Sequence, residues 1–106
     1  MTINERSDAT AMAEAVQNKT VSPRELVEAT IREAERTNPK INAIVSQRYE
    51  KALKESETRD FSDKPFAGVP IFLKDLGQEQ AGEPSTAGSC LFTSYHATET
   101  DNYVKK

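Results

Sequence analysis

Gly68-Val69-Pro70-Ile71-Phe72-Leu73-Lys74-Asp75 holds the run that predicts a central strand in this chain. Val69 to Leu73 is apolar at every position, which is typical of a strand covered by helices on both faces. Pro70 cannot donate to a β-ladder, so regular pairing is expected only from Ile71. Lys74 follows directly. It is either solvated, paired with Asp75, or buried where its pKa falls and a neutral amine can accept a proton.

Beyond this run, residues 77–88 contain three of the four glycines of the chain, together with Pro84. This composition predicts a long irregular loop. In α/β enzymes, loops that follow the carboxyl end of a strand commonly carry the chemistry. Ser85-Thr86-Ala87-Gly88-Ser89 lies at the end of this loop, which makes it the second segment of interest.

Upstream of the run, two helices are predicted from their start signals. Asp8 is placed as the N-cap of a helix of about ten residues. Ser22, Pro23 and Glu25 form a capping box with proline at the first helical position. The second helix is predicted over 23 to about 36, ending before Asn38-Pro39 because a residue that precedes proline is disfavoured in a helix.

The next two elements are a strand and a third helix. Ile41 to Val45 is short and rich in β-branched residues, which favours a strand. From Ser46 to Glu57, residues Tyr49, Ala52, Leu53 and Ser56 recur at helical spacing. The sequence therefore predicts an α/β arrangement in which helices pack on the first strands of a mixed sheet.

Composition limits the classes of partner. The chain has 106 residues, 14 basic and 17 acidic, and a net charge of -3. There is no basic stripe, so nucleic acid is not an expected partner. The absence of an apolar leader and of a membrane-length apolar stretch predicts no membrane association and a cytoplasmic location.

Metal and cofactor sites are not predicted. Cys90 is the only cysteine, so an internal disulfide is excluded. Cys90 and His96 lack a further cysteine or histidine with which to complete a metal site. No phosphate-binding glycine motif is present. We expect no cofactor.

Three segments resemble one known family at matching spacing: Phe66-Ala67-Gly68-Val69-Pro70, Lys74-Asp75, and Thr86 with Gly88 and Ser89. They resemble the N-terminal part of the amidase signature family, serine hydrolases of amide bonds. Within this family, Phe66 to Leu76 is most similar to 6-aminohexanoate cyclic dimer hydrolase-like amidases. Phe72-Leu73 departs from the Gly-Val that many members carry, so substrate preference does not transfer with the resemblance.

The resemblance implies a role for each matching residue. Lys74 is expected to be catalytic, as the general base and acid at the end of a Ser, cis-Ser, Lys relay. Asp75 is expected to support it by orienting the turn after the strand. Thr86, Gly88 and Ser89 match a loop that the family packs near its active site. The full-length relative is expected to hydrolyse a small-molecule amide, linear or cyclic, with water and without a cofactor.

The resemblance also implies that residues 1–106 are the N-terminal portion of a single amidase domain. The two catalytic serines of the family lie further along a chain of several hundred residues. We therefore expect the isolated chain to be a fragment truncated before those serines, and to be inactive. Its apolar helix faces would suit a core formed with further chain.

The sequence is compatible with three alternatives. In the first, Ser85 or Ser89 forms a local Ser-Lys dyad with Lys74, although no Ser-x-x-Lys motif is present. The chain would be an inactive truncated product that self-associates into a homo-oligomer through its uncovered apolar faces. It would also fit the N-terminal piece of a transfer-RNA-dependent amidotransferase subunit, which has a similar lysine motif.

Overall fold

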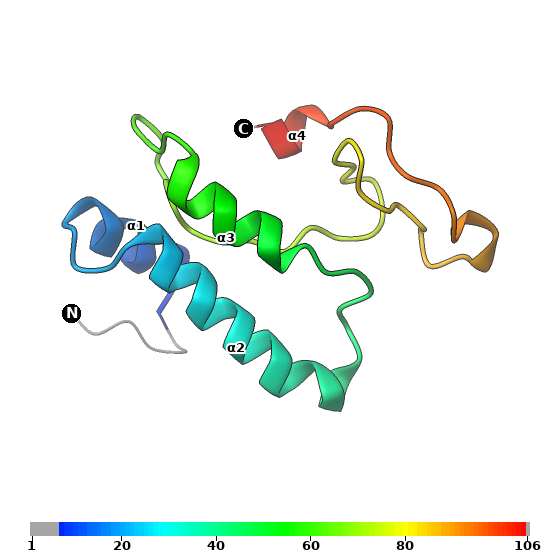
Figure 1. Ribbon diagram of the computed structural model, residues 1–106, viewed down its shortest axis with the longest axis horizontal. Helices are drawn as coiled ribbons and strands as arrows, with labels where there is room; N and C mark the ends of the chain where they lie inside the picture. The colour runs from blue at the N-terminus through cyan, green and yellow to red at the C-terminus, as the bar shows by residue number, and fades with distance from the viewer. Residues whose placement is uncertain (1–6, 106) are drawn as a thin grey trace. The chain divides into compact units, whose positions relative to one another are not determined.

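The computed structural model describes residues 7–105. The chain forms two compact units, one ending at Ile71 and the other beginning at Phe72. The first contains helices α1 (Ala9–Gln17), α2 (Pro23–Ile41) and α3 (Tyr49–Thr58). The second contains a 3-10 turn, η1 (Cys90–Phe92), and the short helix α4 (Asn102–Lys105). Figure 1 shows these elements along the coloured chain.

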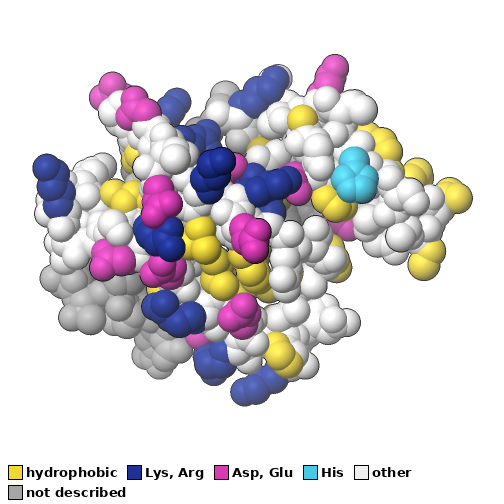
Figure 2. Space-filling model, viewed as in Figure 1, with side chains coloured by type: hydrophobic (Ala, Val, Ile, Leu, Met, Phe, Trp, Pro, Cys, Tyr) yellow, Lys and Arg dark blue, Asp and Glu magenta, His cyan; other side chains and the backbone are white. Residues whose placement is uncertain are grey.

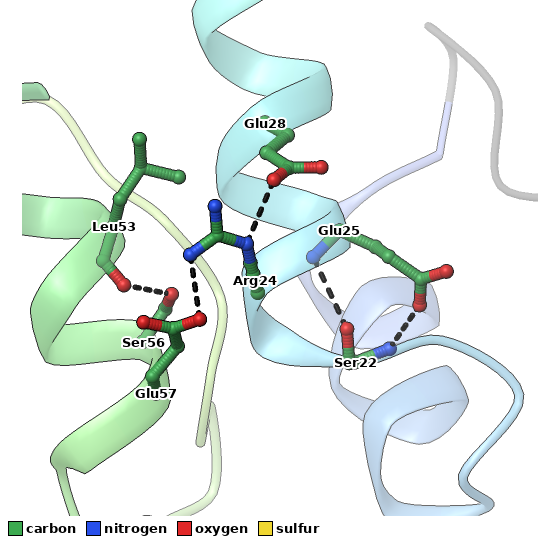
Figure 3. A network of polar contacts seen from close by, with 7 residues as sticks. All are labelled: Ser22, Arg24, Glu25, Glu28, Leu53, Ser56 and Glu57. Carbon is green, nitrogen blue, oxygen red and sulfur yellow. Dashed lines mark hydrogen bonds and ion pairs between the residues drawn. The ribbon is translucent and has the colours of Figure 1, made fainter. Parts of the chain in front are cut away.

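The two predicted helix starts are confirmed. Asp8 caps α1, and its Oδ1 accepts a hydrogen bond of 2.8 Å from the N–H of Ala11. Ser22 caps α2, and its Oγ accepts from the N–H of Glu25 at 3.2 Å. The Glu25 carboxylate accepts in return from the N–H of Ser22 at 2.8 Å, as Figure 3 shows. These bonds lower the pKa of Glu25 and satisfy amide groups that have no partner inside the helix.

The predicted end of α2 is wrong, because the helix continues through Pro39 to Ile41. Pro39 lies in the last turn, where its missing N–H removes a single bond of the helix. Asn42 then takes a left-handed conformation with φ of 49° and donates to the carbonyl of Asn38 at 2.7 Å. The side chain of Asn38 accepts from the amides of Ala43 and Ile44, both at 2.9 Å. Ile41 is therefore the last residue of α2 and not the first residue of a strand.

Helix α3 lies against α2, and charged side chains link the two. Arg24 of α2 donates to Glu57 of α3 at 2.6 Å and to Glu28 on its own helix at 2.8 Å (Figure 3). The third helix was predicted from residue 46 but begins at Tyr49. Arg48, just before it, pairs with Glu55 at 2.7 Å. Because these side chains are partly exposed, each pair contributes little to stability.

Most of the buried apolar residues of the first unit are alanines, with Leu26 and Val27 as the larger ones. The backbone also approaches closely at Gly68, which has φ of +80° and faces the start of α2. A Cβ on Gly68 would lie 2.8 Å from Cγ of Pro23 and 3.3 Å from Cγ1 of Val16. The buried apolar residues of this unit are Ala13, Ala15, Leu26, Val27, Ala34 and Ala67.

The expected strands and mixed sheet are not formed within residues 7–105. Ile41 to Val45 and Val69 to Leu73 carry no strand, and the described ladder contact is a single antiparallel bridge between Pro84 and His96. A strand requires a neighbour for its N–H and C=O groups, and neither run has one here. Accordingly, Val45 is 71% and Ile71 is 70% exposed. The mixed sheet of the α/β prediction is therefore not confirmed, because the regular elements of the described residues are helices.

Apolar side chains lie open between charged ones on the face drawn in Figure 2. Exposed large apolar residues occur in both units, and Leu91 is 84% exposed. No helix within residues 7–105 has the length and apolar character needed to cross a membrane.

Replacing Gly68 with alanine should lower the free energy of unfolding of the first unit by about 2 kcal/mol. The new methyl group adds strain at a positive φ and strikes Pro23. Urea unfolding of the chain, followed by far-ultraviolet circular dichroism of the helices, measures this loss.

The matched control is a double-mutant cycle with Pro23→Ala, which removes the Cγ atom that the methyl group would strike. In the Pro23→Ala background, the cost of Gly68→Ala should fall by about 0.5–1 kcal/mol. Equal costs in the two backgrounds would contradict the packing explanation, and backbone strain would then account for the whole loss of stability.

Candidate functional site

The second unit is organised around the carboxylate of Asp75. Oδ1 accepts from the N–H of Thr86 at 2.8 Å, and Oδ2 accepts from the hydroxyl of the same threonine. The Thr86 hydroxyl is the main cause of a lowered pKa of Asp75, followed by the backbone N–H of Thr86; the backbone N–H groups of Ala87 and Gly88 also contribute. Residues eleven positions apart are thus joined by one ionised side chain.

The turn that binds Asp75 has an unusual backbone. Ala87 and Gly88 follow each other in the left-handed region, with φ of +50° and +69°. The N–H of Gly88 donates to Oγ1 of Thr86 at 3.3 Å, and the hydroxyl of that threonine in turn donates to Asp75. The left-handed conformation costs alanine about 1–2 kcal/mol, which the charged acceptor offsets. The amide of Ser89 closes the turn by donating to the carbonyl of Thr86 at 2.9 Å.

Lys74 lies immediately before this carboxylate and is itself exposed. Its backbone N–H donates to Oε1 of Gln78 at 2.8 Å. The backbone of Lys74 is thus held by Gln78, and the residue after it is held by the turn at residues 86–88. The Lys74 side chain therefore extends from a backbone that is held on both sides, whereas the Asp75 carboxylate is bonded to Thr86.

The two nearby serine hydroxyls have other partners. Ser85 donates from Oγ to Oε1 of Glu79 at 3.0 Å. Ser89 accepts at Oγ from the N–H of Leu91 at 3.2 Å and caps η1. Neither hydroxyl is bonded to Lys74, so the structure does not support the local Ser-Lys dyad.

A second carboxylate, that of Asp101, also holds the loop by accepting a backbone N–H, and the sequence patterns did not reveal it. The N–H of Glu79 donates to Oδ2 of Asp101 at 2.8 Å, and the N–H of Asp101 donates to the carbonyl of Glu79 at 3.0 Å. The sequence analysis also did not identify Gln78 as the acceptor for the Lys74 N–H, because a polar residue in a loop is ordinarily solvated. The bond between Glu79 and Asp101 gives no local signal, because the two residues are 22 positions apart.

An open hollow lies beside these anchors. Glu79 and Ser85 contribute its polar side chains, and its lining is otherwise apolar or glycine. The residues that line it are Leu76, Gly77, Glu79, Ser85, Ala87, Phe92 and Tyr95.

The two residues weighed as metal ligands are not brought into such a site. Cys90 and His96 are both exposed. Across residues 7–105, no group of three histidine, cysteine or acidic side chains is placed to hold a metal ion.

The contribution of Asp75 to stability should depend on pH in a defined direction. Its folded-state pKa is depressed, so its contribution is complete above the unfolded value of about 3.9 and is lost as pH falls through the lower folded value. Nitrogen-15 NMR titration of the Thr86 and Gly88 amides should show a midpoint below the ordinary aspartate value. This transition should be absent in Asp75→Asn, and a midpoint at or above the ordinary value would contradict the geometry.

Comparison with known proteins identifies the family. The family model described as Amidase matches residues 25–106. A 6-aminohexanoate-cyclic-dimer hydrolase of Paenarthrobacter ureafaciens is 46% identical over 80 residues, which cover 76% of this chain and 16% of that protein. A lipoamidase of Enterococcus faecalis is 36% identical over 100 residues, covering 94% of this chain and 14% of the relative.

One subunit of the glutamyl-tRNA(Gln) amidotransferase of Oleidesulfovibrio alaskensis is 33% identical over 90 residues, covering 81% of this chain and 18% of that relative. No solved structure matches the chain. The chain thus spans about a sixth of the length of the curated relatives it matches. The matched residues include the whole segment from Gly68 to Ser89, and the chain belongs to the Amidase family.

Proposed function

We propose that this chain supplies the lysine of an amide-bond hydrolase that works by a Ser, cis-Ser, Lys relay. The observation that carries the proposal is the position of Lys74. Its backbone is fixed by Gln78 and by the turn that binds Asp75, while its side chain is open to a hydroxyl brought to it. The match to the Amidase family over residues 25–106 supports the same reaction class.

In this mechanism Lys74 accepts the proton of the bridging serine, which takes the proton of the nucleophilic serine. The nucleophilic oxygen attacks the carbonyl carbon of the amide. The C–N bond breaks as Lys74 returns the proton to the leaving amine through the same relay. Water then cleaves the ester of the acyl-enzyme, releasing the carboxylic acid and the free serine.

The name of one relative supports the proposed substrate class. The 46% identical relative is named for hydrolysis of the 6-aminohexanoate cyclic dimer, so small linear or cyclic amides are proposed for this chain. Residues 1–106 would form the N-terminal portion of a single amidase domain, with both serines supplied by residues outside the segment. A cytoplasmic location, independence from cofactors and self-association remain predictions.

A second candidate function is participation in a transfer-RNA-dependent amidotransferase. It is favoured by the 33% identity to the glutamyl-tRNA(Gln) amidotransferase relative. The hydrolase proposal is supported by a higher sequence identity, since the 6-aminohexanoate-cyclic-dimer hydrolase is 46% identical to this chain over the matched residues.

The role of Lys74 can be tested in a chimera. This chain would replace the aligned N-terminal segment of the Paenarthrobacter ureafaciens hydrolase, and hydrolysis of 6-aminohexanoate cyclic dimer would be measured. Lys74→Ala should lower kcat by about 10²–10⁴-fold, the range typical for removal of a general acid-base group.

The matched control in this chimera is Lys64→Ala, which removes another exposed lysine and should leave kcat unchanged. A Lys74→Ala chimera that turns over at the parental rate would refute the proposal. So would a folded parental chimera without activity.

The isolated 106-residue chain should not hydrolyse amides. The hydroxyls of Ser85 and Ser89 are engaged elsewhere, so no nucleophile is paired with Lys74 in the described residues. Incubation of the purified chain with 6-aminohexanoate cyclic dimer, followed by chromatography of the products, checks this. Hydrolysis that disappears with Lys74→Ala would show that a complete site exists within the chain.

A further inference from the structure

We propose that Asp75 is a positioning residue for Lys74, acting through the turn at residues 86–88. The catalytic consequence rests on the proposed function, while the structural link stands on the geometry alone. The Asp75 carboxylate is half-buried and has donors on both oxygens. It therefore fixes the backbone on the carboxyl side of Lys74.

The direction of the Lys74 side chain depends on the two peptide units that flank it. The preceding unit is held by the bond of 2.8 Å from the Lys74 N–H to Gln78. The following residue is held by Asp75, through the bond of 2.8 Å from the Thr86 N–H. Since residues 71–74 have no strand ladder in this structure, these two side chains provide the polar anchors of the segment.

The anchor requires a charged acceptor of this size. The partners of Asp75 are an N–H and a hydroxyl of Thr86, with the backbone of Ala87 and Gly88 adding to the effect. An asparagine at position 75 removes the charge, and its NH₂ group can pair with the Thr86 hydroxyl only if that hydroxyl turns to accept. Release of the carboxylate would also leave Ala87 in its left-handed conformation without compensation.

The geometry also separates this role from proton transfer. Both oxygens of Asp75 face Thr86, and the bonds from the turn hold the carboxylate ionised. Asp75 is neither an acid at neutral pH nor a hydrogen-bond partner of the Lys74 side chain in this structure. Its effect on a reaction would pass through the placement of Lys74.

The structural link can be tested in the full 106-residue chain by amide hydrogen exchange, measured by NMR. Asp75→Asn and Thr86→Val should each accelerate exchange at both Gly88 and Lys74 by about tenfold. Asp75→Asn weakens the bonds that hold the turn to a charged acceptor, and Thr86→Val also removes the Oγ1 to which the Gly88 N–H donates at 3.3 Å. Gln78→Ala should accelerate exchange at Lys74 alone. Asp60→Asn is the matched control, since Asp60 also accepts a backbone N–H, from Ser62 at 2.9 Å, and should affect neither amide.

Faster exchange at Gly88 with no change at Lys74 in Asp75→Asn would overturn the link between the turn and the lysine. If Asp75→Asn unfolds the unit, Thr86→Val and Thr86→Ser decide the question. Serine retains the hydroxyl that donates to Asp75, so Thr86→Ser should keep both amides protected, whereas Thr86→Val should not.

The catalytic consequence is measured in the hydrolase chimera. Asp75→Asn and Thr86→Val should lower kcat by about 10- to 100-fold, the loss expected from misplacement by about 1 Å, with a much smaller change in KM. Thr86→Ser should retain the kcat of the parental chimera, because serine keeps the hydroxyl that donates to Asp75. Normal kcat in Asp75→Asn, together with inactive Lys74→Ala, would overturn positioning and leave the proposed function intact. Normal kcat in Lys74→Ala would overturn both.

Discussion

The carboxylate of Asp75 is the interaction on which the second unit depends. Within residues 72–105 it has one β-bridge, one 3-10 turn and a four-residue helix, so few of its backbone groups are satisfied by regular structure. Backbone bonds in turns and loops satisfy others, and side-chain acceptors add to these. Asp75 binds the turn that begins at Thr86, and Asp101 binds Glu79 across 22 positions. Because one acceptor serves several donors, its loss would free the turn as a whole.

The first unit follows a different principle, since its helices provide their own backbone bonds. What it lacks is bulk, for its buried residues are mainly alanines with Leu26 and Val27. Close approach replaces volume, as in the contact of Gly68 with Pro23 at the start of α2. A glycine is required there both by the positive φ and by the absence of space for a Cβ.

The site combines a fixed backbone with a free side chain. Lys74 is exposed, whereas its amide is bonded to Gln78 and its neighbour Asp75 is bonded to the turn. This arrangement suits a group that must meet partners from elsewhere, because the costly ordering of the backbone is already complete. The large apolar side chains left open in both units, such as Ile71 and Leu91, also have room for further packing.

The sequence by itself determined the local features. The caps at Asp8 and Ser22 are confirmed because a side chain that bonds an amide two or three residues away follows from local spacing. The irregular loop after Lys74 and the resemblance of its motifs to the amidase family were also readable, and the family is confirmed. The passage of α2 through Pro39 was not readable, since the rule for residues before proline is a preference, and the helix ends instead at the left-handed Asn42. Tertiary structure alone decided whether the apolar runs at Ile41 and Val69 became strands, because a strand exists only with a partner. It also decided where Asp75 directs its carboxylate, because a bond across eleven residues depends on how the loop closes and not on any local pattern.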